Sequence, residues 1–412
     1  MAPLRPGHQV QLLQGGEAYF SALIEAIDAG VHEVRFETYI FSFTASGEHV
    51  AAALERAAQR KVSVYLVMDG VGTPGIPNEW AARFNAAGVE WRIFSPLGRL
   101  GMVFPSRWRR MHRKLCVVDG LVAFCGGINV LDDLYDPNHG NLKAPRFDFA
   151  VRVTGPLVQD AHEAMAQFWW RSQAARNARR RDFQAAWQAL QEAVSLAFQA
   201  RSGPQGNSDP GARPRTGMLR GSTAADLVLR DNLRNRSRIE RSYRKMIGEA
   251  REEIIIANAY FFPGRKLRKG LIHAAQRGVR VRLLLQGRYE YFLQYHAARP
   301  VYGPLLAAVV EIHEYAASFL HAKVAVIDGR LSTVGSSNLD PLSLLLAREA
   351  NVVVDDVAFA QDLRARLEHA MVHGGARVDP AAYANRPWRQ HFLDRVAFGL
   401  VRIALFLHGQ RY

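Results

Sequence analysis

Long hydrophobic runs are absent from the sequence. No stretch of about 20 uncharged apolar residues, the length that a transmembrane helix requires, occurs in the chain of 412 residues. Residues 1–7 also lack the apolar core of a secretory signal peptide. We therefore predict neither a membrane span nor a secretory signal.

Cysteine is scarce, because the chain has only Cys116 and Cys125. They fall on the two strands of one predicted hairpin, where a cross-strand disulfide is conceivable. A pair of buried free thiols in a reducing compartment is the interpretation that we favour.

Acidic residues are outnumbered, with 38 Asp and Glu against 53 Lys and Arg and a net charge of +15. A surplus of this size indicates an anionic partner, either nucleic acid or a membrane rich in acidic lipid. The acid-rich stretch at residues 132–138 lacks the alternation of a calcium-binding loop. Because the chain is long and 49% hydrophobic, we expect two or three domains with substantial cores.

What the sequence does contain is one motif written twice with the same spacing. Each copy has His-x-Lys, four residues, Asp, six residues, and then Gly-x-x-Asn. A single His-x-Lys carries no information, but two copies in the same long register are a strong signal. The motif residues are His112, Lys114, Asp119 and Asn129 in the first copy, and His321, Lys323, Asp328 and Asn338 in the second.

Each copy predicts a strand and a hairpin turn. Residues 115–118 and 324–327 are apolar and β-branched, and each run ends at Asp-Gly, a strong hairpin signal. Side chains two residues apart share one face of a strand. The histidine and lysine of each copy should therefore point the same way, which places an imidazole beside an ammonium group twice.

Two imidazoles can divide the work of a displacement reaction, one as nucleophile and one as general acid. Histidine suits both roles because its pKa lies near neutral pH. The hydrogen-bond donors beside them are the side chains of Lys114, Lys323, Asn129, Asn338 and Ser336. This set predicts a pocket for one phosphodiester, whose non-bridging oxygens the donors would stabilise in the transition state. Since the lysines supply positive charge, we expect no metal and no cofactor.

Four acidic residues accompany the histidines. Asp119 and Asp328 stand in Asp-Gly turns, where Asp is favoured by local geometry, so within the candidate catalytic motif we interpret them as structural or supporting residues rather than proton carriers. Asp148 and Glu349 lie on the strand predicted after each copy. They are the better candidates for orienting the histidines.

The order of predicted elements also repeats. Helices alternate with strands at 34–43, 62–68 and 90–94, and the pattern restarts near residue 239 with strands at 253–262 and 279–286. Such alternation predicts a largely parallel sheet covered by helices. We therefore predict an α/β fold of two homologous domains, each a largely parallel mixed sheet flanked by helices. A pseudo-two-fold axis would relate them, with one active site at the seam.

The domains are predicted at residues 1–170 and 218–378, joined by a helical connector and flexible linker at 171–217 and followed by a tail at 379–412. The tail is nearly all apolar from Pro387. We favour an interfacial amphipathic helix over a terminal helix packed on the domain. Residues 97–111 are apolar and basic together, and here an ordinary loop and a loop that touches anionic lipid both stay open.

At these residues the chain resembles the phospholipase D superfamily, whose HxK(x4)D(x6)GxxN signature it carries twice. Segments such as 37–41, 110–114, 258–264 and 334–343 resemble the bacterial cardiolipin synthases of the B type. The resemblance implies metal-free transfer through a phosphatidyl-histidine, with His112 as nucleophile and His321 as acid and then base. Gly127 stands where the second copy has Ser336, so the first half-site has one hydroxyl fewer.

The same resemblance implies that two phosphatidylglycerol molecules react to give cardiolipin and glycerol. Hydrolysis by water, cleavage of nucleic acid, and a non-enzymatic role in membrane binding remain alternatives. The apolar tail favours lipid over nucleic acid, and the two complete half-sites favour an enzyme. We expect phosphatidylglycerol and an anionic membrane surface as partners, with the protein bound peripherally to the cytoplasmic face of the bacterial inner membrane.

Overall fold

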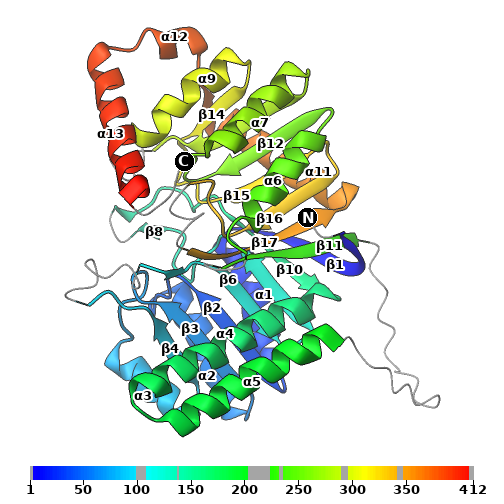
Figure 1. Ribbon diagram of the computed structural model, residues 1–412, viewed down its shortest axis with the longest axis vertical. Helices are drawn as coiled ribbons and strands as arrows, with labels where there is room; N and C mark the ends of the chain where they lie inside the picture. Colours follow the sequence, from blue (N-terminus) through cyan, green and yellow to red (C-terminus); the bar gives the residue numbers. More distant parts are fainter. Residues whose placement is uncertain are drawn as a thin grey trace.

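The computed structural model describes residues 3–98, 108–136, 139–202, 223–231, 235–288, 296–340 and 347–407. Two similar halves lie above and below a pair of central strands (Figure 1). Residues 203–217 of the predicted connector and linker, and most of the loop at 97–111, fall outside the described residues. No helix in these ranges is long and apolar enough to cross a membrane.

In the N-terminal half, three parallel strands follow the predicted alternation with helices. They are β2 (Glu33–Thr38), β3 (Ser63–Asp69) and β4 (Glu90–Phe94), with α1 (Gly15–Ala29), α2 (Ser46–Gln59) and α3 (Asn78–Ala87). Antiparallel strands extend this sheet through the first motif. They are β6 (Lys114–Val118), β7 (Val122–Gly126) and β10 (Phe149–Thr154).

The C-terminal half repeats this order. Its strands are β12 (Glu253–Asn258), β13 (Arg280–Gln286), β14 (Glu311–Tyr315), β15 (Lys323–Ile327), β16 (Leu331–Gly335), β17 (Ala347–Asp355) and the edge strand β18 (Gly375–Arg377). Its helices are α6 (Arg238–Glu249), α7 (Arg265–Gln276), the 3-10 turn η2 (Arg299–Val301), α9 (Tyr302–Ala307) and α11 (Val357–His373). The second motif therefore occupies the same strand pair, β15 and β16, that β6 and β7 form in the first half.

Two strands for which the sequence analysis made no prediction join the halves. β1 (Arg5–Gln14) pairs with β10, and β11 (Thr223–Arg230) pairs with β17. β1 and β11 also pair with each other, in antiparallel orientation. One continuous mixed sheet thus crosses the whole molecule, in the order β18-β14-β13-β12-β15-β16-β17-β11-β1-β10-β7-β6-β2-β3-β4. The predicted fold class, two homologous α/β halves with a mixed sheet flanked by helices, is confirmed. The sheet is not largely parallel as expected, because only β2-β3-β4 and β12-β13-β14 run parallel and the other neighbours along this order pair antiparallel.

The two halves also share a hydrophobic core. Leu115, Val151, Val324 and Val352, one from each of four strands, belong to a single buried cluster. Cys125 lies in this cluster, whereas Cys116 lies in the separate core of the N-terminal half. Because the two thiols occupy opposite faces of the sheet, they do not meet, and the prediction of buried free cysteines is confirmed.

Two predicted strands are shorter than expected. Residues 34–43 and 253–262 were predicted as strands, but β2 ends at Thr38 and β12 at Asn258. After these residues the chain leaves the sheet because its backbone bonds to the Gly-x-x-Asn turns. Ile40 donates to Asn129 Oδ1, and Phe262 donates to the carbonyl oxygen of Leu339.

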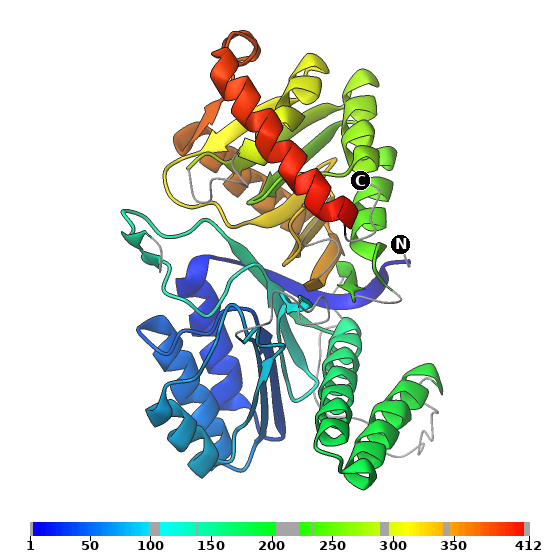
Figure 2. The same ribbon diagram turned by 60° about the vertical axis from the view of Figure 1, so that its left-hand side comes forward.

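The tail comprises α12 (Pro380–Ala384) and α13 (Trp388–Leu407), and α13 lies along the C-terminal half (Figure 2). One side of α13 packs, because buried Asp394 accepts from His296 Nδ1 at 2.7 Å and from Arg386 at 3.1 Å. The other side exposes an apolar stripe of Trp388, Phe392, Val396 and Leu400. The packed side fits the alternative of a terminal helix on the domain, and the interfacial role of the exposed side stays a prediction.

Candidate active site

The two motifs meet because each one bonds to the backbone of the other half. The short strand β5 (Arg110–Met111) pairs in parallel with the start of β17, and the His112 N–H donates to the carbonyl oxygen of Arg348 at 3.1 Å. The His321 N–H donates in the same way to Phe147 O, at 2.9 Å. Each histidine thus bonds to the residue that precedes the candidate orienting acid of the opposite half.

This register brings each imidazole against a carboxylate from the opposite half. His112 Nδ1 lies 3.0 Å from Glu349 Oε1 and 3.1 Å from Oε2, and His321 Nδ1 lies 2.6 Å from Asp148 Oδ2. Both carboxylates are almost fully buried. A carboxylate at Nδ1 favours a proton there and leaves Nε2 with its lone pair. At His321 the ammonium group of Lys323 also lies 2.9 Å from Nδ1. Among the described residues no hydrogen-bond partner is found for either Nε2, so both are available to a substrate.

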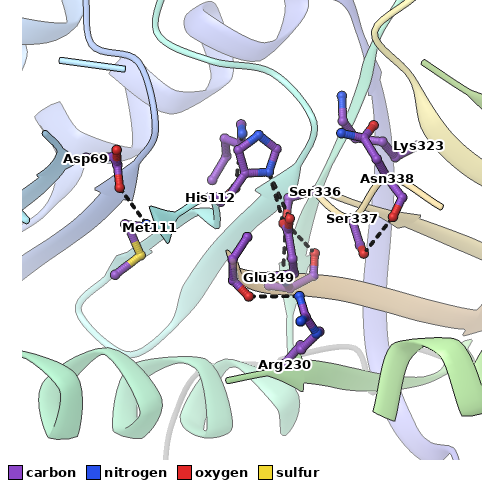
Figure 3. A network of polar contacts seen from close by, with 12 residues as sticks. Asp69, Met111, His112, Arg230, Lys323, Ser336, Ser337, Asn338 and Glu349 are labelled. Atoms are coloured by element: carbon purple, nitrogen blue, oxygen red, sulfur yellow. Dashed lines mark hydrogen bonds and ion pairs between the residues drawn. The ribbon is translucent and has the colours of Figure 1, made fainter. Parts of the chain in front are cut away.

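The two half-sites differ at the position of Ser336 and Gly127. Ser336 Oγ donates to Glu349 Oε2 at 2.5 Å and accepts from the Ala350 N–H at 3.0 Å (Figure 3). A Cβ atom at Gly127 would lie 2.3 Å from Asp148 Oδ1. Asp148, whose side chain is shorter than that of Glu349, therefore places its carboxylate in the space that a serine at position 127 would fill. Ser336 holds the acid behind His112, and its predicted role in binding substrate stays a prediction.

The motif lysines are buried beside the histidines. Lys114 and Lys323 are 1% and 0% exposed, and each ammonium group donates to the carbonyl oxygen of the histidine in its own motif. Burial and the nearby Lys323 charge lower the pKa of Lys114 to about 7. Two buried ammonium groups close to each other form a strong site for an anion. A bound anion would raise the pKa of Lys114 again and so favour its charged form.

Burial also decides the protonation of the histidines. It lowers the pKa of His112, with Glu349 opposing the shift and Lys114 adding to it. The pKa of His321 falls further, because of burial and the charges of Lys323 and Lys114. Burial raises the pKa of Asp148 to about 6 although Lys323 opposes this shift. Without an anion, both imidazoles are therefore neutral at pH 7.

The predicted asparagines lie at the turns that follow β7 and β16. Asn129 Oδ1 accepts from the Ile40 N–H at 3.3 Å, which fixes the chain beyond β2 against the first motif. Asn338 is 3% exposed, and its backbone carbonyl oxygen accepts from the Ser337 hydroxyl at 3.3 Å (Figure 3). The structure therefore gives Asn129 a contact that shapes the site, besides its predicted role as a donor to the substrate.

The motif aspartates lie at the far ends of β6 and β15. Asp119 accepts backbone hydrogen bonds from Val31, His32 and Glu33 at 2.8–2.9 Å. Asp328 makes the matching bonds to residues 251–253. Both residues have positive φ, which Asp tolerates in a tight turn. The structure does not bring them to the histidines, although the motif places them among the catalytic candidates.

Two supporting residues, Asp69 and Tyr39, were missed by the sequence analysis. Asp69 is fully buried and accepts from Arg110 Nη1 at 2.9 Å and from the Met111 N–H at 2.7 Å, so it anchors β5 immediately before His112 (Figure 3). The Tyr39 ring packs edge-on against the His112 imidazole, with 4.9 Å between centroids. The sequence did offer a signal for Asp69. It stands at the carboxyl end of β3, and functional sites of open α/β sheets lie at the carboxyl ends of the strands.

Among the described residues, no group of three or more His, Cys, Asp or Glu side chains is arranged to hold a metal ion. The groups that converge are instead two imidazoles, two ammonium groups and two carboxylates. Imidazole, ammonium and carboxylate in this arrangement bind an anion and move protons.

The comparisons with known proteins agree with this geometry. A family model described as "Cardiolipin synthase, PLD-like domain" matches residues 23–143 and 243–371, which include the catalytic histidine and lysine candidates of both motifs. The chain therefore belongs to the phospholipase D-like cardiolipin synthase family of enzymes, and within it resembles the B type.

Cardiolipin synthase B of Escherichia coli strain K12 is 37% identical over 97% of this chain and 89% of its own length. Cardiolipin synthase A of Pseudomonas fluorescens is 29% identical over 90% of this chain and 70% of its own. A solved structure of phosphatidylserine synthase from Haemophilus influenzae has a TM-score of 0.66 at 12% identity, and covers 98% of this chain and 95% of its own. The last likeness concerns the fold alone.

Proposed function

We propose that the protein is a cardiolipin synthase that transfers a phosphatidyl group from one phosphatidylglycerol to the headgroup hydroxyl of a second. The observation that carries the proposal is the pair of crosswise histidine–carboxylate contacts beside two buried lysines. Such a site offers a nucleophile, an acid and cationic donors to one phosphodiester. Its kinship with the B-type cardiolipin synthases supports the choice of lipid.

In the first step, His112 Nε2 attacks phosphorus and the bond from phosphorus to the headgroup glycerol oxygen breaks. Bound substrate favours protonation of His321, which gives its proton to that oxygen, and glycerol leaves. In the second step, neutral His321 takes the proton from the headgroup hydroxyl of another phosphatidylglycerol. That oxygen attacks phosphorus, the phosphorus–nitrogen bond breaks, and cardiolipin forms. Lys114 and Lys323 stabilise the non-bridging oxygens in both steps.

The protein would work as a peripheral protein on the cytoplasmic face of the bacterial inner membrane. The exposed stripe of α13, in which Trp388 is 72% and Phe392 62% exposed, supports such binding, since Trp and Phe favour the lipid interface. Deletion of residues 387–412 should weaken binding to anionic vesicles. If the truncated and full chains co-sediment with vesicles equally, the tail has only a packing role.

The experiment that tests the reaction uses purified protein, phosphatidylglycerol vesicles and excess chelator, followed by lipid chromatography. Cardiolipin and free glycerol in equal amounts are the expected products. Phosphatidic acid in their place would mean that water is the acceptor, and the protein would then be a phospholipase D. Absence of any lipid product would overturn the proposal and direct attention to nucleic acid.

A further inference from the structure

The helical hairpin that links the two halves in the sequence exposes bulky apolar residues on its outer helix instead of burying them. It consists of α4 (Leu157–Arg179), which packs on the sheet, and α5 (Phe183–Ser202), which packs on α4. Figure 2 shows α5 as the outer helix of this hairpin, separated from the sheet by α4. The proposed catalytic steps use no residue of either helix.

The face of α5 that contacts the protein is made of small residues. Ala189 and Ala193 are buried, and Ala185 and Ala186 are partly buried. The large side chains point outward, because Phe183 is 71% exposed, Trp187 62%, Leu190 41% and Val194 45%. These four residues recur at steps of four, three and four and form one stripe along the helix, which we call the α5 stripe.

A basic cluster adjoins the start of the α5 stripe. Arg176, Arg180 and Arg181 are exposed at the turn from α4 to α5. None of their guanidinium groups takes part in an ion pair among the described residues. Three free cations beside an outward-facing stripe of Phe, Trp, Leu and Val are the pattern of an interfacial helix that binds anionic lipid.

We propose that the α4–α5 hairpin is a second membrane-binding element, distinct from α13. The α5 stripe inserts at the boundary between the lipid headgroups and the acyl chains, and the basic cluster binds lipid phosphates. The occupant is the surface of a bilayer that contains acidic phospholipid. Charge complementarity supports this choice, since the chain carries a net charge of +15 and the hairpin adds an unpaired cationic cluster next to its apolar surface. The proposal concerns binding and is independent of the proposed reaction.

The test measures co-sedimentation of the full chain with vesicles of phosphatidylcholine alone or mixed with phosphatidylglycerol. The variant Trp187→Gln/Leu190→Gln should lower the apparent association constant for mixed vesicles about tenfold or more, because two apolar side chains that insert into the interface are lost. The matched control is Val372→Gln, which replaces an exposed apolar residue on α11. It should bind like the unchanged protein.

The basic cluster is tested separately. Arg176→Gln/Arg180→Gln should weaken binding to mixed vesicles about tenfold and leave the weak binding to phosphatidylcholine unchanged. The control Arg251→Gln/Arg377→Gln removes the same charge from exposed positions elsewhere. If the two double variants lose vesicle binding equally, the loss reflects total charge. That result would overturn the proposal that this cluster is a specific lipid-binding site.

Two further outcomes would also overturn the proposal. Unchanged vesicle binding by the Trp187→Gln/Leu190→Gln variant would show that lipid does not cover the α5 stripe. Loss of a dimer by that variant in sedimentation velocity, with vesicle binding intact, would assign the stripe to contact between copies of the chain. Activity on phosphatidylglycerol in detergent micelles separates this question from the reaction. The hairpin variants should retain micellar activity, whereas failure of the proposed function would abolish it in the unchanged protein as well.

Discussion

Glu349 in the C-terminal half holds the imidazole of His112 in the N-terminal half, with 3.0 Å between Oε1 and Nδ1. The partner contact, Asp148 to His321 at 2.6 Å, runs in the opposite direction. Neither half therefore contains a complete histidine–acid pair. This exchange explains in physical terms why two half-sites must fold against each other to form one site.

Replacement of Glu349 by Gln should lower kcat about 100-fold, because the amide keeps the shape but loses the charge that supports a proton on His112. KM should change little, since Glu349 lies behind the imidazole. Steady-state kinetics and circular dichroism measure both effects. Ser336→Ala is the graded comparison and should cost less, as it removes only the hydroxyl that bonds Glu349. Wild-type kcat in Glu349→Gln would contradict the orienting role.

The division of roles between the histidines can be read with a phosphatidyl ester of p-nitrophenol, whose leaving group needs no general acid. His321→Ala should release a burst of about one equivalent of nitrophenol and accumulate a phosphatidyl-enzyme. His112→Ala should give no burst. Stopped-flow absorbance measures the burst, and mass spectrometry locates the adduct. The opposite pattern would make His321 the nucleophile.

Lys114→Met should be inactive yet more stable than the unchanged protein by roughly 1–3 kcal/mol, since it removes a buried charge placed beside another. The folded pKa of about 7 lies below the unfolded value near 10.4. Between these values the unfolded chain binds more protons, so this group makes the native state more stable as pH rises from 7 to 10. The stability difference between variant and parent should be largest at pH 7 and shrink toward pH 10.

Denaturant titrations at several pH values measure that difference. Lys245→Met removes a lysine that is exposed on α6 and serves as the control, with no gain expected. If Lys114→Met is less stable than the parent, the contacts of the ammonium group stabilise the folded state by more than its desolvation destabilises it.

Asp119→Ala should lower the free energy of unfolding by about 1–3 kcal/mol, because three backbone N–H groups lose their acceptor. Its kcat at a temperature where the variant is folded should equal that of the parent. Asp119→Asn retains one oxygen and tolerates the positive φ, so it should lose less stability. A large fall in kcat for a folded Asp119→Asn would place this aspartate in the chemistry after all.

Gly127→Ser makes the first half-site resemble the second in sequence, and it should be harmful. The new Cβ atom would lie 2.3 Å from Asp148 Oδ1, so the carboxylate must move away from His321. We expect kcat to fall about tenfold or more. Gly127→Ser/Asp148→Asn should show little further loss, because both changes affect one contact. Full activity in Gly127→Ser would show that the site adapts.

The sequence by itself determined the repeated motif, the strands and turns that carry it, and the alternation that gives the α/β fold. These features depend on local periodicity and turn chemistry, which a single chain displays directly. It also indicated Asp148 and Glu349, and it identified Asp119 and Asp328 as turn residues, because Asp before Gly is a local preference.

Only the tertiary structure decided which acid serves which histidine. The contact joins residues 237 positions apart, and it depends on the pairing of β5 with β17 across the two halves. Two predicted strands ended early for a related reason, since bonds to distant turns replaced the strand ladder at Ile40 and Phe262. The outward face of α5 was also beyond the sequence, because periodicity shows that a stripe exists while packing against α4 decides which side of the helix is buried.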